Sequence, residues 1–142
     1  MKYISFILAL LFCQQMNAQV KKAYNIQRTE YAPVIDGKLD DKAWQEAQVG
    51  TDFIQFKPDV GKGLPDYQKT TVQITYNDDA IFIGAYLKDK PENILKQLTQ
   101  RDDFGQADFF GIIFNPNNDS QNDTEFFVFS SGAQADAIAT PT

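Results

Sequence analysis

The sequence predicts an all-β fold, a β-sandwich of the immunoglobulin-like or jelly-roll-like kind with only short helices. Its 142 residues are enough for one domain. Several apolar stretches of strand length are separated by turn residues, and the chain has no repeats or heptads. The clearest stretch is 70–88, where Val72, Ile74 and Tyr76 alternate with polar residues and so predict a strand with one buried face.

Residues 1–18 have the features of a secretory signal peptide. Lys2 is followed by an apolar run at 4–12 and by an imperfect small-residue cleavage site at 16–18, and the run is too short to span a membrane. Phe12 precedes Cys13 where a lipoprotein signal has a small residue, which argues against lipidation. We therefore expect an exported protein, located in the periplasm, the outer membrane or outside the cell.

Composition excludes several classes of function. The net charge is −6, which disfavours nucleic acid and anionic membrane surfaces as partners. After residue 18 the chain contains no Cys, His or Met, so it offers no Ser-His-Asp or Cys-His triad, no ordinary zinc site and no Met/His haem ligands. Carboxylates, hydroxyls and amides remain, and these suit sugar binding, calcium or carboxylate-based hydrolysis.

The first half of the chain predicts an arm, a helix and a hairpin. Residues 19–33 form a polar arm and first strand, and residues 34–35 a short strand before an Asp36-Gly37 turn. Asp40 is the expected N-cap of a helix, with Asp41 in its first turn and Trp44 packed on a sheet. Residues 53–56 read as a strand and 59–66 as a loop. Residues 71–76 and 80–87 predict a β-hairpin, whose adjacent acids at 78–79 we interpret as a solvated turn rather than a metal site.

The second half predicts a short helical segment and three further strands. Pro91 opens the helical segment at 92–98, and strands follow at 108–114, 125–129 and 134–138. Gly111, in the middle of its strand, marks a bulge or the close approach of another group. Because the chain stops just after a strand begins, we expect a C-terminally incomplete domain over 34–142 with an exposed apolar edge.

Three stretches carry a family resemblance: VIDGKLDDKAW at 34–44, TVQITYNDDAIFIGAYLKD at 71–89 and DFFGIIFNPNND at 108–119. In this order they resemble carbohydrate-binding module family 9, over residues 34–137. The resemblance implies a β-sandwich that binds polysaccharide or oligosaccharide within carbohydrate-degrading systems, often joined to glycoside hydrolases. The chain also looks like the N-terminal module of larger bacterial envelope proteins. In those, the downstream partner region is thought to form an outer-membrane β-barrel.

The acidic loop around Phe104 is the candidate ligand site, with Asp102, Asp103 and Asp108 as its carboxylates. An aromatic ring can stack on a sugar, and carboxylates beside it can accept hydrogen bonds from the sugar hydroxyls. The alternative is a solvated loop with Phe104 in the core. In the resembled family a stacking aromatic, an acidic and a basic ligand fall at Gly105, Gly111 and Phe127 here, where none is retained, and a second stacking Trp falls beyond Thr142. The resemblance therefore implies the fold of that family more strongly than it implies the family's sugar specificity.

Two other sites compete with this loop. Oxygen ligands at Asn117, Asp119 and Asp123 make calcium a possible cofactor, although the spacing is not that of an EF-hand and a plain hairpin loop is the alternative. Asp108 and Glu125 both begin strands on neighbouring segments, and a hydrolase fragment would use such a pair as acid and base. We predict no catalytic residue. The rivals of a sugar-binding module are a structural or interaction module of a membrane-barrel protein and a fragment of an O-glycosyl hydrolase.

Overall fold

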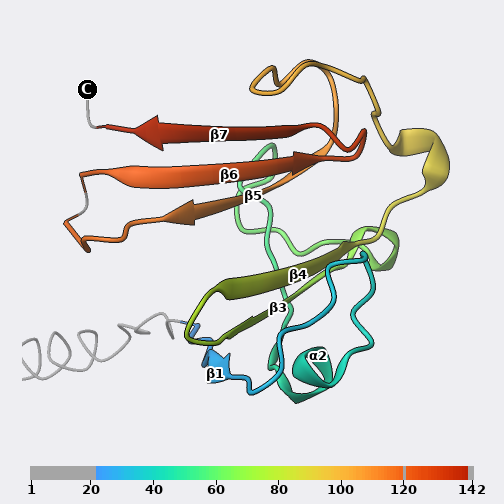
Figure 1. Cartoon of the computed structure of the whole chain (residues 1–142). Helices are drawn as coiled ribbons and strands as arrows, with labels where there is room; N and C mark the ends of the chain where they lie inside the picture. Colours follow the sequence, from blue (N-terminus) through green and yellow to red (C-terminus); the bar gives the residue numbers. More distant parts are fainter. Residues whose placement is uncertain (1–21, 120, 141–142) are drawn as a thin grey trace, which may run out of the picture.

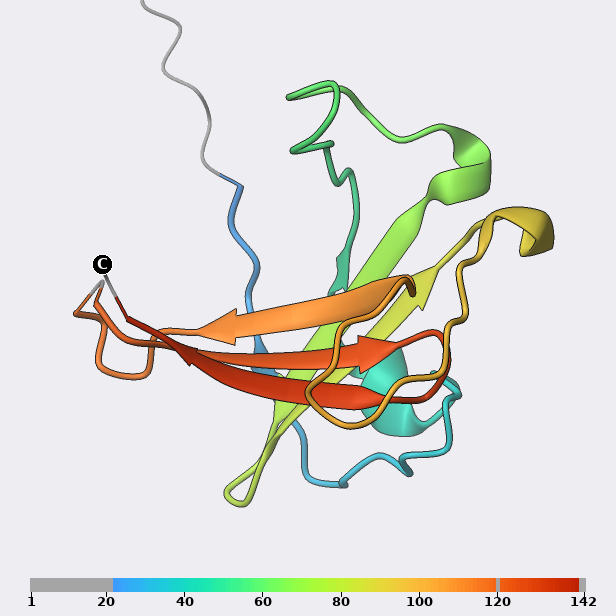
Figure 2. The same ribbon diagram turned by 90° about the horizontal axis from the view of Figure 1, so that it is seen from above.

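The computed structural model describes residues 22–119 and 121–140, and over these the regular secondary structure is mostly β-strand, arranged in two sheets with almost no helix (Figure 1). The prediction of an all-β fold is thus confirmed. The two sheets lie one over the other, and their strands cross at a wide angle when seen from above (Figure 2). The predicted signal peptide at 1–18 lies outside the described residues.

The first sheet is built around β3 (Thr70–Tyr76). The hairpin partner β4 (Ile81–Leu87) pairs antiparallel with β3 along its whole length, from Thr70 opposite Leu87 to Tyr76 opposite Ile81. Along its other edge β3 pairs in succession with β2 (Val49–Gly50), antiparallel, and β1 (Gln27–Arg28), parallel. The alternating apolar pattern therefore predicted this hairpin correctly.

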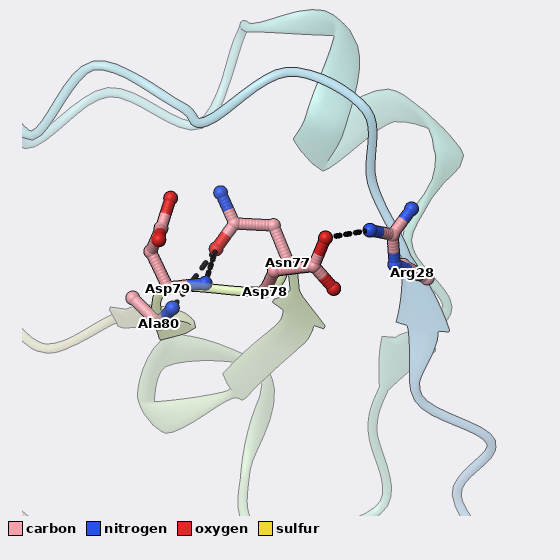
Figure 3. A network of polar contacts seen from close by, with 5 residues as sticks. All are labelled: Arg28, Asn77, Asp78, Asp79 and Ala80. Atoms are coloured by element: carbon pink, nitrogen blue, oxygen red, sulfur yellow. Dashed lines mark hydrogen bonds and ion pairs between the residues drawn. The ribbon is translucent and has the colours of Figure 1, made fainter.

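The hairpin turn confirms the interpretation of the adjacent acids as turn residues (Figure 3). The side-chain oxygen of Asn77 accepts the backbone N–H groups of Asp79 and Ala80, at 2.9 Å each, which is the local bond that makes Asn a turn residue. Asp78 forms an ion pair at 2.5 Å with Arg28 of β1, and this pair raises the pKa of the guanidinium. The turn thereby ties the hairpin to the first strand.

The short helix α2 (Lys42–Glu46) covers one face of the first sheet (Figure 1). Trp44, 2 % exposed, packs against Gly84 of β4, where an added Cβ would lie 3.4 Å from the indole Cη2. Trp44 is therefore buried, as predicted. Gly84 leaves the room that the ring and Leu39 occupy, because any larger side chain there would meet both.

The start of this helix was predicted one residue too early. Asp41, not Asp40, precedes the first helical residue, and no side chain caps the helix. The Asp41 carboxylate instead accepts the backbone N–H of Val34 at 3.0 Å. The strand predicted at 34–35 is also wrong, because Val34 and Ile35 belong to no strand and are 63 % and 79 % exposed.

The second sheet is an antiparallel meander of β5 (Phe109–Phe114), β6 (Asp123–Phe129) and β7 (Gln134–Ala139). All three strands were predicted, at 108–114, 125–129 and 134–138. Gly111 lies opposite Phe127, and an added Cβ would be 2.8 Å from two ring carbons of that Phe. The glycine therefore marks the close approach of another group and not a bulge, since the Phe127 ring fills the space beside it.

Two predicted elements are much shorter than expected. The strand at 53–56 is reduced to a single bridge between Ile54 and Gly63, and the helical segment at 92–98 to the 3-10 turn η2 (Pro91–Asn93). Beyond this turn Lys96 forms an antiparallel bridge with Ala107, so tertiary pairing overrides helix propensity. A second 3-10 turn, η1 (Asp66–Gln68), precedes β3.

The buried core is small and lies in two places. Six apolar residues of the described chain are buried: Ala43, Trp44, Ala47, Val72, Phe129 and Ala135. Ala43, Trp44 and Ala47 lie on the α2 side of the first sheet, and Val72 lies in that sheet on its opposite face, beside Ala85. The last two lie in the second sheet. None of the helices within 22–119 and 121–140 is long and apolar enough to cross a membrane.

Candidate functional site

The candidate site is the loop between η2 and β5, which folds over the second sheet (Figure 1). The loop closes on itself near its base, where Asp108 N–H donates to the Leu95 carbonyl at 2.9 Å. Higher up, the Thr99 hydroxyl donates to the Asp103 carbonyl at 2.6 Å. These bonds give the loop a defined shape and hold Phe104 near its tip.

Phe104 sits on a cluster of three other phenylalanines. Its ring centroid is 4.8 Å from that of Phe127, 5.2 Å from that of Phe129 and 5.8 Å from that of Phe109, in edge-to-face geometry each time. Phe129 is 3 % exposed, whereas Phe104 remains 41 % exposed. Phe104 is therefore both an anchor of the loop and a partly accessible ring.

Asp102 fastens the loop to the edge of β7. Its backbone N–H donates to the Gln134 carbonyl, and its carboxylate Oδ1 accepts the Asp136 N–H, both at 3.1 Å. Asp102 has a φ of 66°, in the left-handed region that Asp tolerates better than most residues. Arg101 adds an ion pair to the Asp136 side chain. Asp102 thus acts like one residue of an extra strand at this edge.

The carboxylates of Asp103 and Asp108 each accept a backbone hydrogen bond through one of their two oxygens. Asp103 Oδ1 accepts the Gly105 N–H, and Asp108 Oδ2 accepts the Leu95 N–H, both at 3.2 Å. The second oxygens, Asp103 Oδ2 and Asp108 Oδ1, have no hydrogen-bond partner in the described part of the chain. A carboxylate fixed in this way presents a free acceptor in a set direction, at little further entropic cost.

Of the three positions that the resemblance singles out, two lie together, and the third, Gly105, lies against Thr99 and Gln97 instead. Gly111 and Phe127 are opposite each other on β5 and β6, and Phe104 packs on the Phe127 ring. Where that family would place an acid and a base, however, this chain has a glycine and the aromatic ring that fills its space. Any ligand here would meet a more apolar surface.

The calcium candidates lie in the β5–β6 loop, where their polar groups bind one another. Asp119 Oδ1 accepts the backbone N–H groups of Gln121 and Asn122, at 2.9 and 3.2 Å, and these bonds lower the pKa of the carboxyl. Asp123 Oδ1 accepts the Asn115 amide at 3.0 Å, and Asn117 is exposed. Within 22–119 and 121–140, no group of three or more acidic, His or Cys side chains could hold a metal ion.

The acid pair considered for hydrolysis is separated by the strand pairing. Glu125 lies opposite Ile113 because β5 and β6 are antiparallel. Asp108 precedes Ile113 by five residues, which corresponds to roughly 17 Å of extended chain. Glycosidase carboxylates lie about 5–9.5 Å apart. The inference that both residues begin strands and so could be close was wrong, since antiparallel strands begin at opposite ends.

Sequence reasoning missed a groove of about 1130 Å³ between the sheets. Its lining includes apolar residues of β4, β5 and β6, together with Lys57, Lys88 and Asp89. The pKa of Asp89 is lowered, chiefly by the Gln68 amide, which donates to it at 3.1 Å. Single-strand patterns could not reveal this groove, because it depends on how far apart the two sheets lie.

No family model, no curated protein and no solved structure matches this chain.

Proposed function

We propose that this chain is an exported, non-catalytic carbohydrate-binding module whose two sheets form a β-sandwich of the immunoglobulin-like or jelly-roll-like kind. The observation that carries the proposal is the partly exposed Phe104 ring, held on a cluster of phenylalanines beside carboxylates with a free oxygen. A sugar has apolar C–H faces and a rim of hydroxyls. A fixed ring next to fixed acceptors suits that mixed surface.

The preorganised loop supports this proposal. Because Asp102 and Asp103 are already hydrogen-bonded to the backbone, a ligand would not have to order them on binding. Stacking on one aromatic ring contributes about 1–3 kcal/mol to binding, by analogy with stacked bases. A module with a single such ring would bind weakly and would serve to keep a larger protein near a polysaccharide.

The cellular setting is part of the same proposal. The signal-peptide pattern at 1–18 favours the periplasm, the outer membrane or the outside of the cell. The resemblance to the N-terminal modules of envelope proteins favours downstream domains in the same polypeptide, among them a membrane β-barrel or a glycoside hydrolase.

A second candidate function is that of an interaction module without a sugar site. It is favoured by the apolar side chains of the facing sheets, which stay exposed: Ile81, Leu87, Phe126 and Val128 are 46–55 % accessible. Patches of this kind on an ordinary monomer often mark interaction surfaces.

Calorimetry of the chain from residue 19 onward against plant and microbial polysaccharides tests the first proposal. We expect Phe104→Ala to weaken glycan binding by about 1–3 kcal/mol, and Asp103→Asn, which keeps the loop hydrogen bond, to weaken it less. The matched control is Phe56→Ala, because Phe56 is 79 % exposed and outside this loop. Equal losses for Phe104→Ala and Phe56→Ala would exclude Phe104 as the platform, and no heat with any glycan would favour the interaction module.

A further inference from the structure

The free edge of β4 is defined by its hydrogen bonds to β3. The N–H of Asn77 donates to the Ala80 carbonyl, and that of Lys88 donates to the Lys69 carbonyl, both at 3.0 Å. In an antiparallel pair, hydrogen-bonded and non-hydrogen-bonded positions alternate between these two ends. The backbone groups of even-numbered β4 residues therefore face β3, and those of the odd-numbered ones face away from it: Ile81, Ile83, Ala85 and Leu87.

This edge lacks three of the features that usually keep an edge strand from pairing. β4 contains no charge and no proline, and its pairing with β3 runs without a bulge. In the part of the chain that the structure describes, no hydrogen bond occupies the outward groups of the four odd-numbered residues. The edge of β7 is different, because Asp102 occupies its Gln134 carbonyl and Asp136 N–H.

The side chains of the same four residues point toward the second sheet. Ile81 is 55 % and Leu87 49 % exposed, and they border the space between the sheets. Across that space, Phe126 and Val128 are 46 % and 53 % exposed. A strand added beside β4 would place every second side chain over these surfaces. One added strand would therefore both pair with the free edge of β4 and cover the exposed apolar side chains.

Charge distinguishes the two ends of the edge. The groove is lined by the bases Lys38, Lys57 and Lys88 and by the acids Asp89 and Asp108, so its lining has one positive charge in excess. Lys88 directly follows Leu87, and no carboxylate of the described residues lies within ion-pair distance of Lys57 or Lys88. At the Ile81 end, the hairpin turn presents Asp79, which likewise has no ion-pair partner among those residues. An incoming antiparallel strand is therefore complementary if it begins with an acid and ends with a base.

We propose that β4 binds one extended β-strand of a partner polypeptide, antiparallel to it, with apolar residues at alternate positions, an acidic residue at its N-terminal end and a basic one at its C-terminal end. Strand addition of this kind takes its affinity from the backbone ladder and its specificity from the alternate side chains. The inference rests on the second candidate function and deepens it, and it does not require that glycan binding be absent, so the peptide titration tests it separately from glycan calorimetry.

The probe is a fluorescent synthetic peptide, Glu-Val-Thr-Ile-Thr-Val-Thr-Leu-Lys, titrated into the chain from residue 19 onward. We expect saturable binding with slowed hydrogen exchange at the Ile83 and Ala85 amides. Ile83→Pro, which deletes an outward donor without touching the β3 ladder, should weaken binding about fivefold or more. Its matched control is Ile138→Pro, which deletes an outward N–H on the edge of β7 and should leave the affinity unchanged.

Two further measurements keep the proposal falsifiable if Ile83→Pro fails to fold. Lys88→Glu, an exposed charge reversal, should weaken the peptide about fivefold. A peptide with the terminal Glu and Lys exchanged should bind more weakly than the probe, and equal affinity would overturn the proposed orientation. No binding, or binding that Ile83→Pro and Ile138→Pro reduce equally, would overturn the site. Self-association that Ile83→Pro abolishes would make a second copy the occupant and overturn the partner strand.

Discussion

Truncating Trp44 should remove the largest single contribution to the core beneath the first sheet. The side chain is 2 % exposed and packs on Gly84. Trp44→Ala withdraws about 200 Å² of buried surface, which at about 25 cal/mol per Å² corresponds to about 5 kcal/mol. A compact unfolded chain lowers this figure by about 10–40 %. We expect a loss of about 3–5 kcal/mol in the free energy of unfolding, the usual range for buried aromatics.

A second substitution, Trp44→Phe, separates the contribution of ring packing from the effect of the buried indole N–H. The Trp44 Nε1 is buried and has no hydrogen-bond partner within the described residues. Leaving such a donor unpaired costs about 1–3 kcal/mol, so removing it offsets part of the packing lost with a smaller ring. Trp44→Phe should therefore destabilise the fold by only about 1–2 kcal/mol, well below Trp44→Ala.

Urea unfolding followed by far-UV circular dichroism measures both effects, because Trp44 is the only Trp and fluorescence would be lost with it. The control is Phe56→Ala at a site 79 % exposed, where we expect a change within about 0.5 kcal/mol. If Trp44→Ala destabilised the fold no more than Phe56→Ala, the packing argument would be refuted. If Trp44→Phe destabilised the fold as much as Trp44→Ala, the argument that the unpaired indole N–H destabilises the folded protein would be refuted.

Three further predictions concern the second sheet and its loops. Gly111→Ala should cost about 1–3 kcal/mol in urea unfolding, since its Cβ would meet the Phe127 ring at 2.8 Å, and Phe127→Leu should relieve part of that loss. Asp102→Ala should cost about 1–2 kcal/mol and speed hydrogen exchange at the Asp136 amide, whereas Asp102→Asn, which keeps an acceptor and tolerates a positive φ, should do neither. The pKa of Asp119 is lowered below its ordinary 3.8, so its stabilising effect on the loop is complete above about pH 4 and is lost as the pH falls through the folded-state pKa. NMR of the Gln121 and Asn122 amides should show this transition, and Asp119→Asn should abolish it.

The sequence by itself determined the strands and turns whose signals are local. The alternation at 72–76 and the Asn77 turn were sufficient to predict the β3–β4 hairpin, since side-chain period and turn chemistry act within a few residues. The stretches at 108–114, 125–129 and 134–138 likewise predicted β5 to β7, and burial of Trp44 followed from its size and position on a helix. Local signals failed at 53–56 and 92–98, where bridges from Ile54 to Gly63 and from Lys96 to Ala107 determine the backbone.

Only the tertiary structure decided how the candidate residues are used. Antiparallel pairing, invisible in the spacing of two acids, put Asp108 and Glu125 at opposite ends of a hairpin. Contacts between residues distant in sequence attach Asp102 to β7 through the Asp136 N–H and pack the Phe104 ring on an aromatic cluster. Periodicity shows which side of a strand is apolar, but what covers that side depends on the distance between two sheets. That distance is set by the sum of all long-range contacts, which no single stretch of the sequence encodes.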